Sequence, residues 1–220
     1  MTLRHERRGP EAPDRLVIFL HGYGANAADL IGLADPLGPH LPGTAFLAPD
    51  APEELPGMPG GFQWFPIPWL DGSSEEAAQA GMARAIEDLN AWLDEVIAAE
   101  GVPISNVALF GFSQGTMMAL HVGPRRDPGL AGIVGFSGRL LSPETLADEV
   151  ATRPPVLLVH GDADEVVPVQ SLPQAAEALE GAGFDRVYAH IMKGTGHGIA
   201  PDGLSVALAF LRDIWSIESD

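Results

Sequence analysis

The pentapeptide Gly111-Phe112-Ser113-Gln114-Gly115 has the G-x-S-x-G pattern of a nucleophilic serine on a tight turn. It lies between an apolar stretch, VALFGF at 107–112, and an apolar helix-like run, TMMALHV at 116–122. A serine at a sharp strand-to-helix turn has a strained backbone, and only small residues fit two positions away on either side. The pattern and its context therefore predict that Ser113 is a nucleophile.

A serine hydroxyl needs a general base, and the base needs a carboxylate that fixes its tautomer. In this type of site the order along the chain is serine, then Asp or Glu, then His. Two later loops follow apolar stretches and supply these residues: HGDADEVVP at 160–168 and KGTGHG at 193–198. Glycines flank His197 on both sides, so we expect His197 to be the base. Asp162 and Asp164 are both candidates for the carboxylate, and spacing alone does not decide between them.

The reaction also needs two amide donors for the oxyanion that forms during acyl transfer. The glycine-rich segment HGYGAN at 21–26 directly follows an apolar stretch. One donor commonly comes from this first loop and the other from the residue after the nucleophile, which predicts the backbone N–H groups of Tyr23 and Gln114. The segment does not fit a phosphate-binding loop, because it contains neither G-x-G-x-x-G nor G-x-x-x-x-G-K.

The elements that must position these loops alternate along the chain. Stretches that are apolar throughout are typical of strands covered on both faces of a parallel sheet, and they occur at 16–20, 44–49, 107–112, 132–136, 156–160 and 187–192. Helical patterns separate them, so we predict a three-layer α/β sandwich with a mostly parallel sheet and helices on both faces. The length and the uniform composition predict a single domain, residues 1–220.

Two helices are the clearest. A helix over about 74–100 is predicted by the capping-box spacing of Ser73 and Glu76, the stop at Gly101 and an apolar stripe of Met82, Ile86, Leu89, Leu93 and Val96. After Pro201, a second amphipathic helix is predicted by the spacing of Leu204, Leu208, Leu211 and Trp215.

Composition excludes several classes of protein. The 220 residues contain no cysteine, which removes disulfide scaffolds, iron–sulfur clusters and thiol nucleophiles. Lys193 is the single lysine, which argues against a Schiff-base cofactor, and no H-E-x-x-H pattern indicates a metal. His160, Asp162 and Asp164 are neighbours in one loop, and such neighbours rarely complete a metal shell. We therefore expect neither metal nor cofactor.

Charge and hydropathy bear on partners and location. The formal net charge of −18 argues against binding nucleic acid or an anionic membrane, and it favours a neutral or cationic small-molecule substrate. The first ten residues, MTLRHERRGP, lack the apolar core of a signal peptide, and no apolar run approaches 18 residues. We expect a cytoplasmic protein without a membrane-inserted segment.

The segment 51–72, APEELPGMPGGFQWFPIPWLDG, is too rich in proline and glycine for a helix or a central strand. Long loops of this kind are often functional. Its aromatic residues either pin the loop to the core or form an apolar wall of a binding site, and a compact loop can do both. The candidates for a wall around an acyl chain are Leu30, Phe62, Trp64, Phe65 and Trp69.

Over nearly its whole length the chain resembles the phospholipase/carboxylesterase family of α/β-hydrolases, which includes bacterial carboxylesterases and acyl-protein thioesterases. The motifs that carry the resemblance are HGYGANAADL (21–30), PDAP (49–52), FQWFPI (62–67), GFSQGT (111–116), HGDADEVVP (160–168) and GTGHGI (194–199).

The resemblance implies an α/β-hydrolase fold in which a tryptophan-containing loop forms a small lid instead of a separate cap domain. It implies that Asp164 is the catalytic carboxylate, because Asp164 fits the aspartate of the family's H-G-x-x-D-x-x-V-P pattern. It also places the oxyanion amides on Tyr23 and Gln114, and it implies a homodimer.

These observations predict a serine carboxylesterase that hydrolyses small-to-medium esters through an acyl-enzyme on Ser113. The thioesterase branch usually has an aspartate after the aromatic pair, whereas Trp64-Phe65 is followed here by Pro66, which favours the smaller esters. The alternatives are an acyl-protein thioesterase or lysophospholipase that prefers long acyl chains, and a non-catalytic ligand-binding protein with the same fold.

Overall fold

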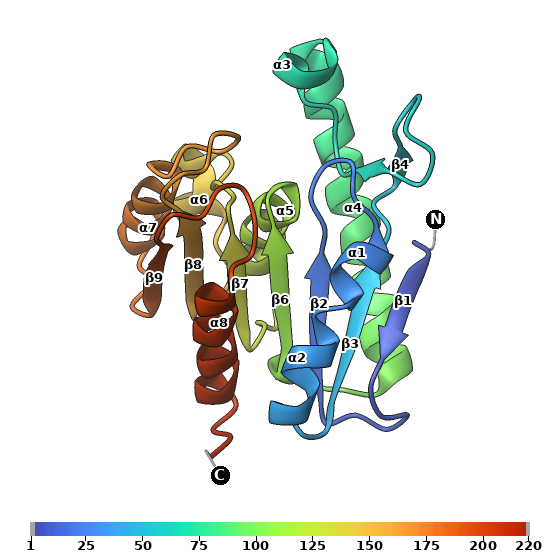
Figure 1. Cartoon of the computed structure of the whole chain (residues 1–220), viewed down its shortest axis with the longest axis vertical. Helices are drawn as coiled ribbons and strands as arrows, with labels where there is room; N and C mark the ends of the chain where they lie inside the picture. Colours follow the sequence, from blue (N-terminus) through green and yellow to red (C-terminus); the bar gives the residue numbers. More distant parts are fainter. Residues whose placement is uncertain (1–2, 219–220) are drawn as a thin grey trace.

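The computed structural model describes residues 3–218, and a seven-stranded sheet runs through its centre (Figure 1). The strand order is β1-β3-β2-β6-β7-β8-β9. The strands that pair in parallel are β2 (Arg15–Leu20), β3 (Thr44–Pro49), β6 (Val107–Phe112), β7 (Gly132–Phe136), β8 (Val156–Gly161) and β9 (Val187–Met192). Each apolar stretch named above forms one of these strands, which confirms the prediction of a mostly parallel sheet.

The sequence analysis missed one strand of the central sheet. β1 (His5–Arg8, HERR) pairs antiparallel with β3 at the edge of the sheet. Its side chains are charged and largely exposed, so it lacks the apolar pattern of a covered strand. Edge strands tolerate such residues, because one side of the strand has no neighbour in the sheet.

Alternate side chains of the strands pack into two apolar cores, one on each face of the sheet. In β2, Leu16, Ile18 and Leu20 contact one core, and Val17 and Phe19 contact the other. The first core is covered by α4 (Glu75–Glu100), α5 (Gln114–Val122), α6 (Pro143–Glu149) and α7 (Ser171–Gly181). The second is covered by α1 (Ala27–Ile31), α2 (Ala34–Leu37) and α8 (Pro201–Ile214). Helices therefore lie on both faces (Figure 1), and the three-layer prediction is confirmed.

The long helix α4 matches the predicted range, but its N-cap differs from the expectation. The side chain of Ser74, not Ser73, accepts a hydrogen bond from the amide of Ala77 at the first turn. Gly101 ends the helix in the left-handed conformation, with φ of 68°. Short 3₁₀ turns complete the connections: η1 (Gly38–His40), η2 (Ile104–Asn106) and η3 (Gly123–Arg125).

The helix α8 forms where it was predicted, but it is rotated relative to the expected stripe. Its buried residues are Gly203, Ala207, Phe210 and Leu211, whereas Leu204 and Leu208 are only partly buried. Gly203 passes so close to the strands that an added Cβ would overlap Met192 and Phe136. The small residues on this face, and not the leucines alone, set how the helix packs.

The proline-rich segment 51–72 contains a two-stranded ribbon, β4 (Glu53–Glu54) with β5 (Phe62–Gln63), and one helical turn, α3 (Pro68–Asp71). In Figure 1 this segment and the start of α4 project beyond the end of the sheet at which β2 and β6 finish. Among residues 3–218, no helix combines the length and the apolar character needed to cross a bilayer.

The position of the α4 cap generates a prediction with a matched control. Ser74→Ala leaves the amide of Ala77 without its side-chain acceptor, and we expect it to lower the free energy of unfolding by about 1 kcal/mol. Ser73→Ala removes a hydroxyl of the same size that does not accept from the first turn, so we expect a smaller change. Urea denaturation of the two variants checks this, and an equal loss in both would contradict the assignment.

Candidate active site

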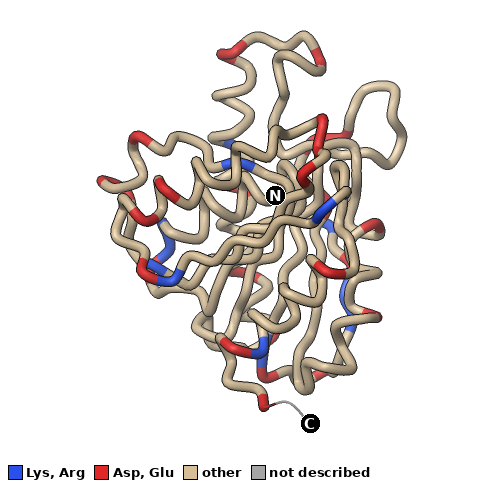
Figure 2. Tube along the Cα trace, turned by 60° about the vertical axis from the view of Figure 1, so that its left-hand side comes forward, with Lys and Arg blue, Asp and Glu red and all other residues tan. Residues whose placement is uncertain are grey.

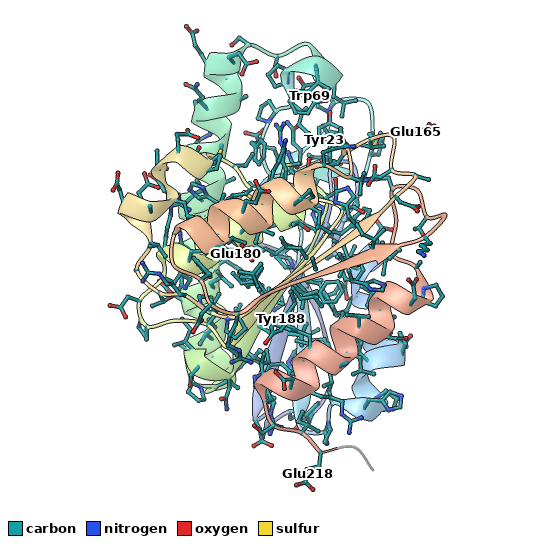
Figure 3. The ribbon with its side chains drawn as sticks, turned by 90° about the vertical axis from the view of Figure 1, so that its left-hand side faces the viewer. Tyr23, Trp69, Glu165, Glu180, Tyr188 and Glu218 are labelled. Carbon is teal, nitrogen blue, oxygen red and sulfur yellow. The ribbon has the colours of Figure 1, made fainter. Side chains whose placement is uncertain are left out.

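Loops at the carboxyl ends of the parallel strands bring the predicted residues to one edge of the sheet. Ser113 follows β6 directly, Asp164 lies three residues after β8, and His197 lies five residues after β9. The carboxyl ends of parallel strands are where open α/β sheets build their sites. Figure 3 shows Tyr23, Trp69 and Glu165, from three of the surrounding loops, at the same end of the molecule.

The turn at Ser113 is strained, as the motif predicts. Ser113 has φ of 53° and ψ of −115°, a conformation that costs energy for a residue with a side chain. Its amide donates to the carbonyl of Phe136 at 2.8 Å, which ties the turn to strand β7. A Cβ at Gly115 would overlap the carbonyl oxygen of Leu20, and one at Gly111 would overlap the backbone of Thr116. Both glycines are therefore required by the close approach of α5 to the sheet.

Asp164 and His197 form a direct pair. The Nδ1 atom of His197 lies 2.8 Å from Oδ2 of Asp164, and the Asp164 side chain is inaccessible to solvent while that of His197 is 19% exposed. The other oxygen, Oδ1, accepts from the amides of Val166 and Val167 at 2.9 Å each. With Nδ1–H donated to the carboxylate, Nε2 of His197 is left to accept a proton.

The environment of Asp164 keeps its carboxylate ionised. Burial by itself would raise the pKa of Asp164, but the hydrogen bonds from His197 and from the amides of Val167 and Val166 outweigh it. The pKa of Asp164 therefore lies below the ordinary value for aspartate. An ionised carboxylate can hold the imidazole in one tautomer and stabilise its protonated form.

The neighbouring acidic residue has a different partner. Oδ1 of Asp162 accepts from the amide of Gly194 at 2.6 Å, so Asp162 holds the loop that carries His197 and does not contact the imidazole. His160 is buried, and its Nε2 atom lies 2.8 Å from the carbonyl oxygen of Val167 and 3.3 Å from Oδ2 of Asp164. In residues 3–218, no group of three or more His, Cys, Asp and Glu side chains is arranged to hold a metal ion.

The segment 21–26 runs beside the serine. A Cβ at Gly22 would lie 3.2 Å from Cβ of Ser113, so this loop and the nucleophile are in close proximity. Within residues 3–218, neither the Tyr23 amide nor the Gln114 amide donates to another residue. Both amides are therefore free to donate, and their role as oxyanion donors stays a prediction.

The side chain of Gln114 has a role that the sequence analysis missed. It is fully buried, its Oε1 atom accepts from the amide of Trp64 at 2.9 Å, and its Nε2 atom donates to the carbonyl of Phe65 at 2.8 Å. The residue that follows the nucleophile thus also fixes the aromatic loop. The motif drew attention only to the backbone of Gln114, and no sequence spacing links it to a loop about 50 residues away.

His21 is a second residue that sequence reasoning passed over. Its Nε2 atom accepts from the amide of Ala51 at 2.9 Å, which places the proton on Nδ1, 2.7 Å from the carbonyl oxygen of Gly22. Burial lowers the pKa of His21, so the ring is neutral at pH 7. The carbonyl of His21 accepts from Nε1 of Trp64 at 2.9 Å. This buried network joins the segment 21–26 to the start and to the middle of the proline-rich loop.

The five residues expected to line an acyl chain are placed differently from one another. Leu30, Trp64 and Phe65 are buried in the two cores, and Phe62 lies against a small separate hollow beside Leu3. Trp69, which is 69% exposed, borders a cavity of about 700 Å³ at the ends of β7 and β8. The loop aromatics therefore both pin the loop and, through Trp69, face a cavity.

Comparison with known proteins identifies the family of this chain. The model of the phospholipase/carboxylesterase family matches residues 7–215. Esterase YpfH of Escherichia coli is 31% identical, with 96% of this chain and 89% of that protein covered. Acyl-protein thioesterase 1 of Gibberella zeae is 30% identical, with 89% and 88% covered.

Among solved structures, that of esterase PE8 is 42% identical, has a TM-score of 0.90 and covers 97% of this chain and all of that one. This likeness confirms the predicted α/β-hydrolase fold. No separate cap domain is evident in residues 3–218.

The ionised state of Asp164 generates a prediction about pH. Asp164→Asn should lower the free energy of unfolding at pH 7 by about 2 kcal/mol, the scale of hydrogen bonds to a charged group. The pKa of Asp164 is lower in the folded state than the value of about 3.9 in the unfolded state. The carboxylate therefore stabilises the fold above the unfolded-state pKa, and the stabilisation is lost as pH falls through the folded-state pKa. Urea denaturation should show a similar difference from wild type at pH 7 and 4.5 and a smaller one at pH 3, and an undiminished difference at pH 3 would contradict the argument.

The buried side-chain amide of Gln114 leads to a prediction about stability and activity. Gln114→Met keeps the backbone donor and the volume of the side chain, but it leaves the Trp64 amide and the Phe65 carbonyl without partners. We expect a loss of about 2 kcal/mol in unfolding free energy and a lower kcat/KM on esters. The control Gln63→Met removes one hydrogen bond to Glu53 in the same loop and should change both quantities less.

Proposed function

This chain belongs to the phospholipase/carboxylesterase family of hydrolases, and we propose that it is a serine carboxylesterase that hydrolyses carboxylic esters with small-to-medium acyl chains. The observation that carries the proposal is the 2.8 Å contact of His197 with the buried carboxylate of Asp164, at the sheet edge where Ser113 occupies its strained turn. These are the nucleophile, base and carboxylate of acyl transfer.

In the proposed reaction, His197 Nε2 removes the proton of Ser113 as Oγ attacks the ester carbonyl carbon. The backbone amides of Tyr23 and Gln114 stabilise the resulting oxyanion, each contributing about 3 kcal/mol to the lowering of the barrier. The protonated imidazole, held by Asp164, donates its proton to the departing alcohol. Water then attacks the acyl-enzyme with His197 again as the base, which releases the carboxylic acid and restores the hydroxyl of Ser113.

Two features support the smaller esters as substrates. Pro66 follows Trp64-Phe65, where the thioesterase branch usually has aspartate, and the loop continues into the exposed turn α3. The relative named esterase YpfH aligns over nearly the whole chain, as does the structure named esterase PE8. The expected homodimer, the cytoplasmic location and all five residues of the acyl wall stay predictions.

A second candidate is an acyl-protein thioesterase or lysophospholipase that acts on long acyl chains. The observation in its favour is the 30% identity with a protein named acyl-protein thioesterase 1, which covers 89% of this chain. Both candidates use the same serine mechanism, and they differ in the length and the leaving group of the substrate.

Hydrolysis of p-nitrophenyl esters from acetate to palmitate, by the wild type and by Ser113→Ala, tests the proposal. We expect a loss of at least about 1,000-fold in kcat in the variant, because the nucleophile is removed and only binding and oxyanion stabilisation remain. An optimum at short or medium chains supports the carboxylesterase, and an optimum at palmitate supports the second candidate. Undiminished turnover by Ser113→Ala would overturn the mechanism.

Incubation with a fluorophosphonate distinguishes the enzyme from a non-catalytic binding protein with the same fold. We expect the intact mass of the wild type to rise by one phosphonyl group, because an activated serine displaces fluoride, and that of Ser113→Ala to stay unchanged. A wild-type protein that is folded but unlabelled would instead indicate a binding protein.

A further inference from the structure

One arginine differs from the others in having no polar partner. The chain has twelve Lys and Arg residues, and all but Lys193 are arginines. Ten of the eleven arginines donate a hydrogen bond to a carboxylate, an amide oxygen or a backbone carbonyl. Arg139 forms no hydrogen bond or ion pair with any residue in 3–218, although Asp and Glu positions are spread over the whole Cα trace (Figure 2). Its recorded contact is a cation–π contact with Trp69, 5.0 Å from the ring centroid.

Arg139 borders the cavity of about 700 Å³ that adjoins the proposed catalytic residues. Met117 forms part of the wall, one helical turn after the nucleophile, and its amide donates to the carbonyl of Ser113. Val166 forms another part, and its amide donates to Asp164. The wall of the cavity thus contains residues hydrogen-bonded to Ser113 and to Asp164, which places the cavity beside the proposed catalytic residues.

The charge of the cavity wall is opposite to that of the chain. The protein has 30 acidic residues, but none of them lines this cavity, and Arg139 is the one charged residue that does among residues 3–218. The remaining wall is apolar or neutral, with the hydroxyl of Ser142 and the amide of Gln174 as examples of the neutral polar groups. A cation placed here without a counter-ion favours an anionic ligand.

The contact with Trp69 leaves the guanidinium able to bind. A cation–π contact uses the positive charge but not the N–H donors of the guanidinium, and those donors form a planar fork that fits a carboxylate. Trp69 thus limits the positions of the Arg139 side chain without satisfying its hydrogen-bonding groups. Figure 3 shows Trp69 at the end of the molecule that also carries Tyr23.

We propose that Arg139 binds a carboxylate carried by the ester substrate, so that the enzyme selects esters with a second, ionised carboxyl group over neutral esters of the same length. The inference rests on the proposed esterase function and names a substrate class for it. The carboxylate is carried either by the acyl chain or by the alcohol, and the same guanidinium chemistry recognises both.

Two matched pairs of substrates test the proposal. Mono-p-nitrophenyl adipate against p-nitrophenyl hexanoate places the carboxylate on the acyl side, and 4-(butyryloxy)benzoate against its carboxamide places it on the alcohol side. For at least one pair, we expect Arg139→Gln to lower the kcat/KM ratio of acidic to neutral ester by about ten-fold or more, the scale of a lost charge-assisted hydrogen bond. In Arg139→Gln, kcat/KM for the neutral esters should change less than two-fold. Arg139→Lys should retain part of the preference for the acidic ester.

A control variant distinguishes direct binding by Arg139 from a long-range effect of removing one positive charge. Arg186→Gln removes the same unit charge before β9, at the opposite end of the strands from the site, and should leave both ratios unchanged. The proposal is overturned if Arg139→Gln leaves both ratios unchanged or lowers kcat/KM equally for the acidic and the neutral esters. It is also overturned if Arg186→Gln lowers the ratio as much as Arg139→Gln does.

A binding measurement keeps this test separate from the proposed catalytic function. In the Ser113→Ala background, isothermal titration calorimetry should detect tighter binding of monomethyl adipate than of methyl hexanoate, and the addition of Arg139→Gln should remove the difference. If the wild type hydrolyses no ester but this difference is found, the catalytic proposal fails while the carboxylate site stands. If the two ligands bind equally, the carboxylate site fails irrespective of turnover.

Discussion

The close approach of helix α5 to the sheet is the constraint on which the rest of the site depends. Gly111 and Gly115 leave no room for a Cβ, because the backbone of Thr116 and the carbonyl of Leu20 occupy that space. This approach forces the chain from β6 into α5 within one residue, and that residue is Ser113 with a positive φ. The strained backbone of Ser113 persists because the buried strand and helix on either side of it are packed too tightly to relax.

The same turn organises the loops around it. Gln114 is the first residue of α5, and its buried side chain binds the backbone of the aromatic loop at Trp64 and Phe65. Trp64 in turn donates to the carbonyl of His21, at the start of the loop that carries Tyr23. The proposed oxyanion donors and the aromatic loop are thus parts of one hydrogen-bonded unit, which makes their positions mutually dependent.

On the other side of Ser113, two carboxylates position the histidine loop, and the ring of Phe112 also packs against that of His197, with 4.9 Å between centroids. Asp162 holds the loop that precedes His197, and Asp164 holds the imidazole itself. Within this acidic chain, the cavity next to these loops is bordered by one arginine and no carboxylate. The protein therefore combines an ionised carboxylate buried beside its base with an adjacent cavity wall whose one charged residue within 3–218 is an arginine.

The sequence by itself determined the strands, the sheet class and the order of the chemical residues, because apolar stretches, helical periods and the spacing around Ser113 are local signals. Local signals were weaker at the edge strand β1, whose charged residues carry no apolar pattern, and at the cap of α4, where two adjacent serines compete.

Only the tertiary structure decided the contacts made across long sequence separations. It paired Asp164 with His197, gave Asp162 a backbone partner, clamped the aromatic loop to Gln114 and left Arg139 without a counter-ion. Such contacts depend on which loops meet at the sheet edge, and no spacing within one segment encodes that meeting.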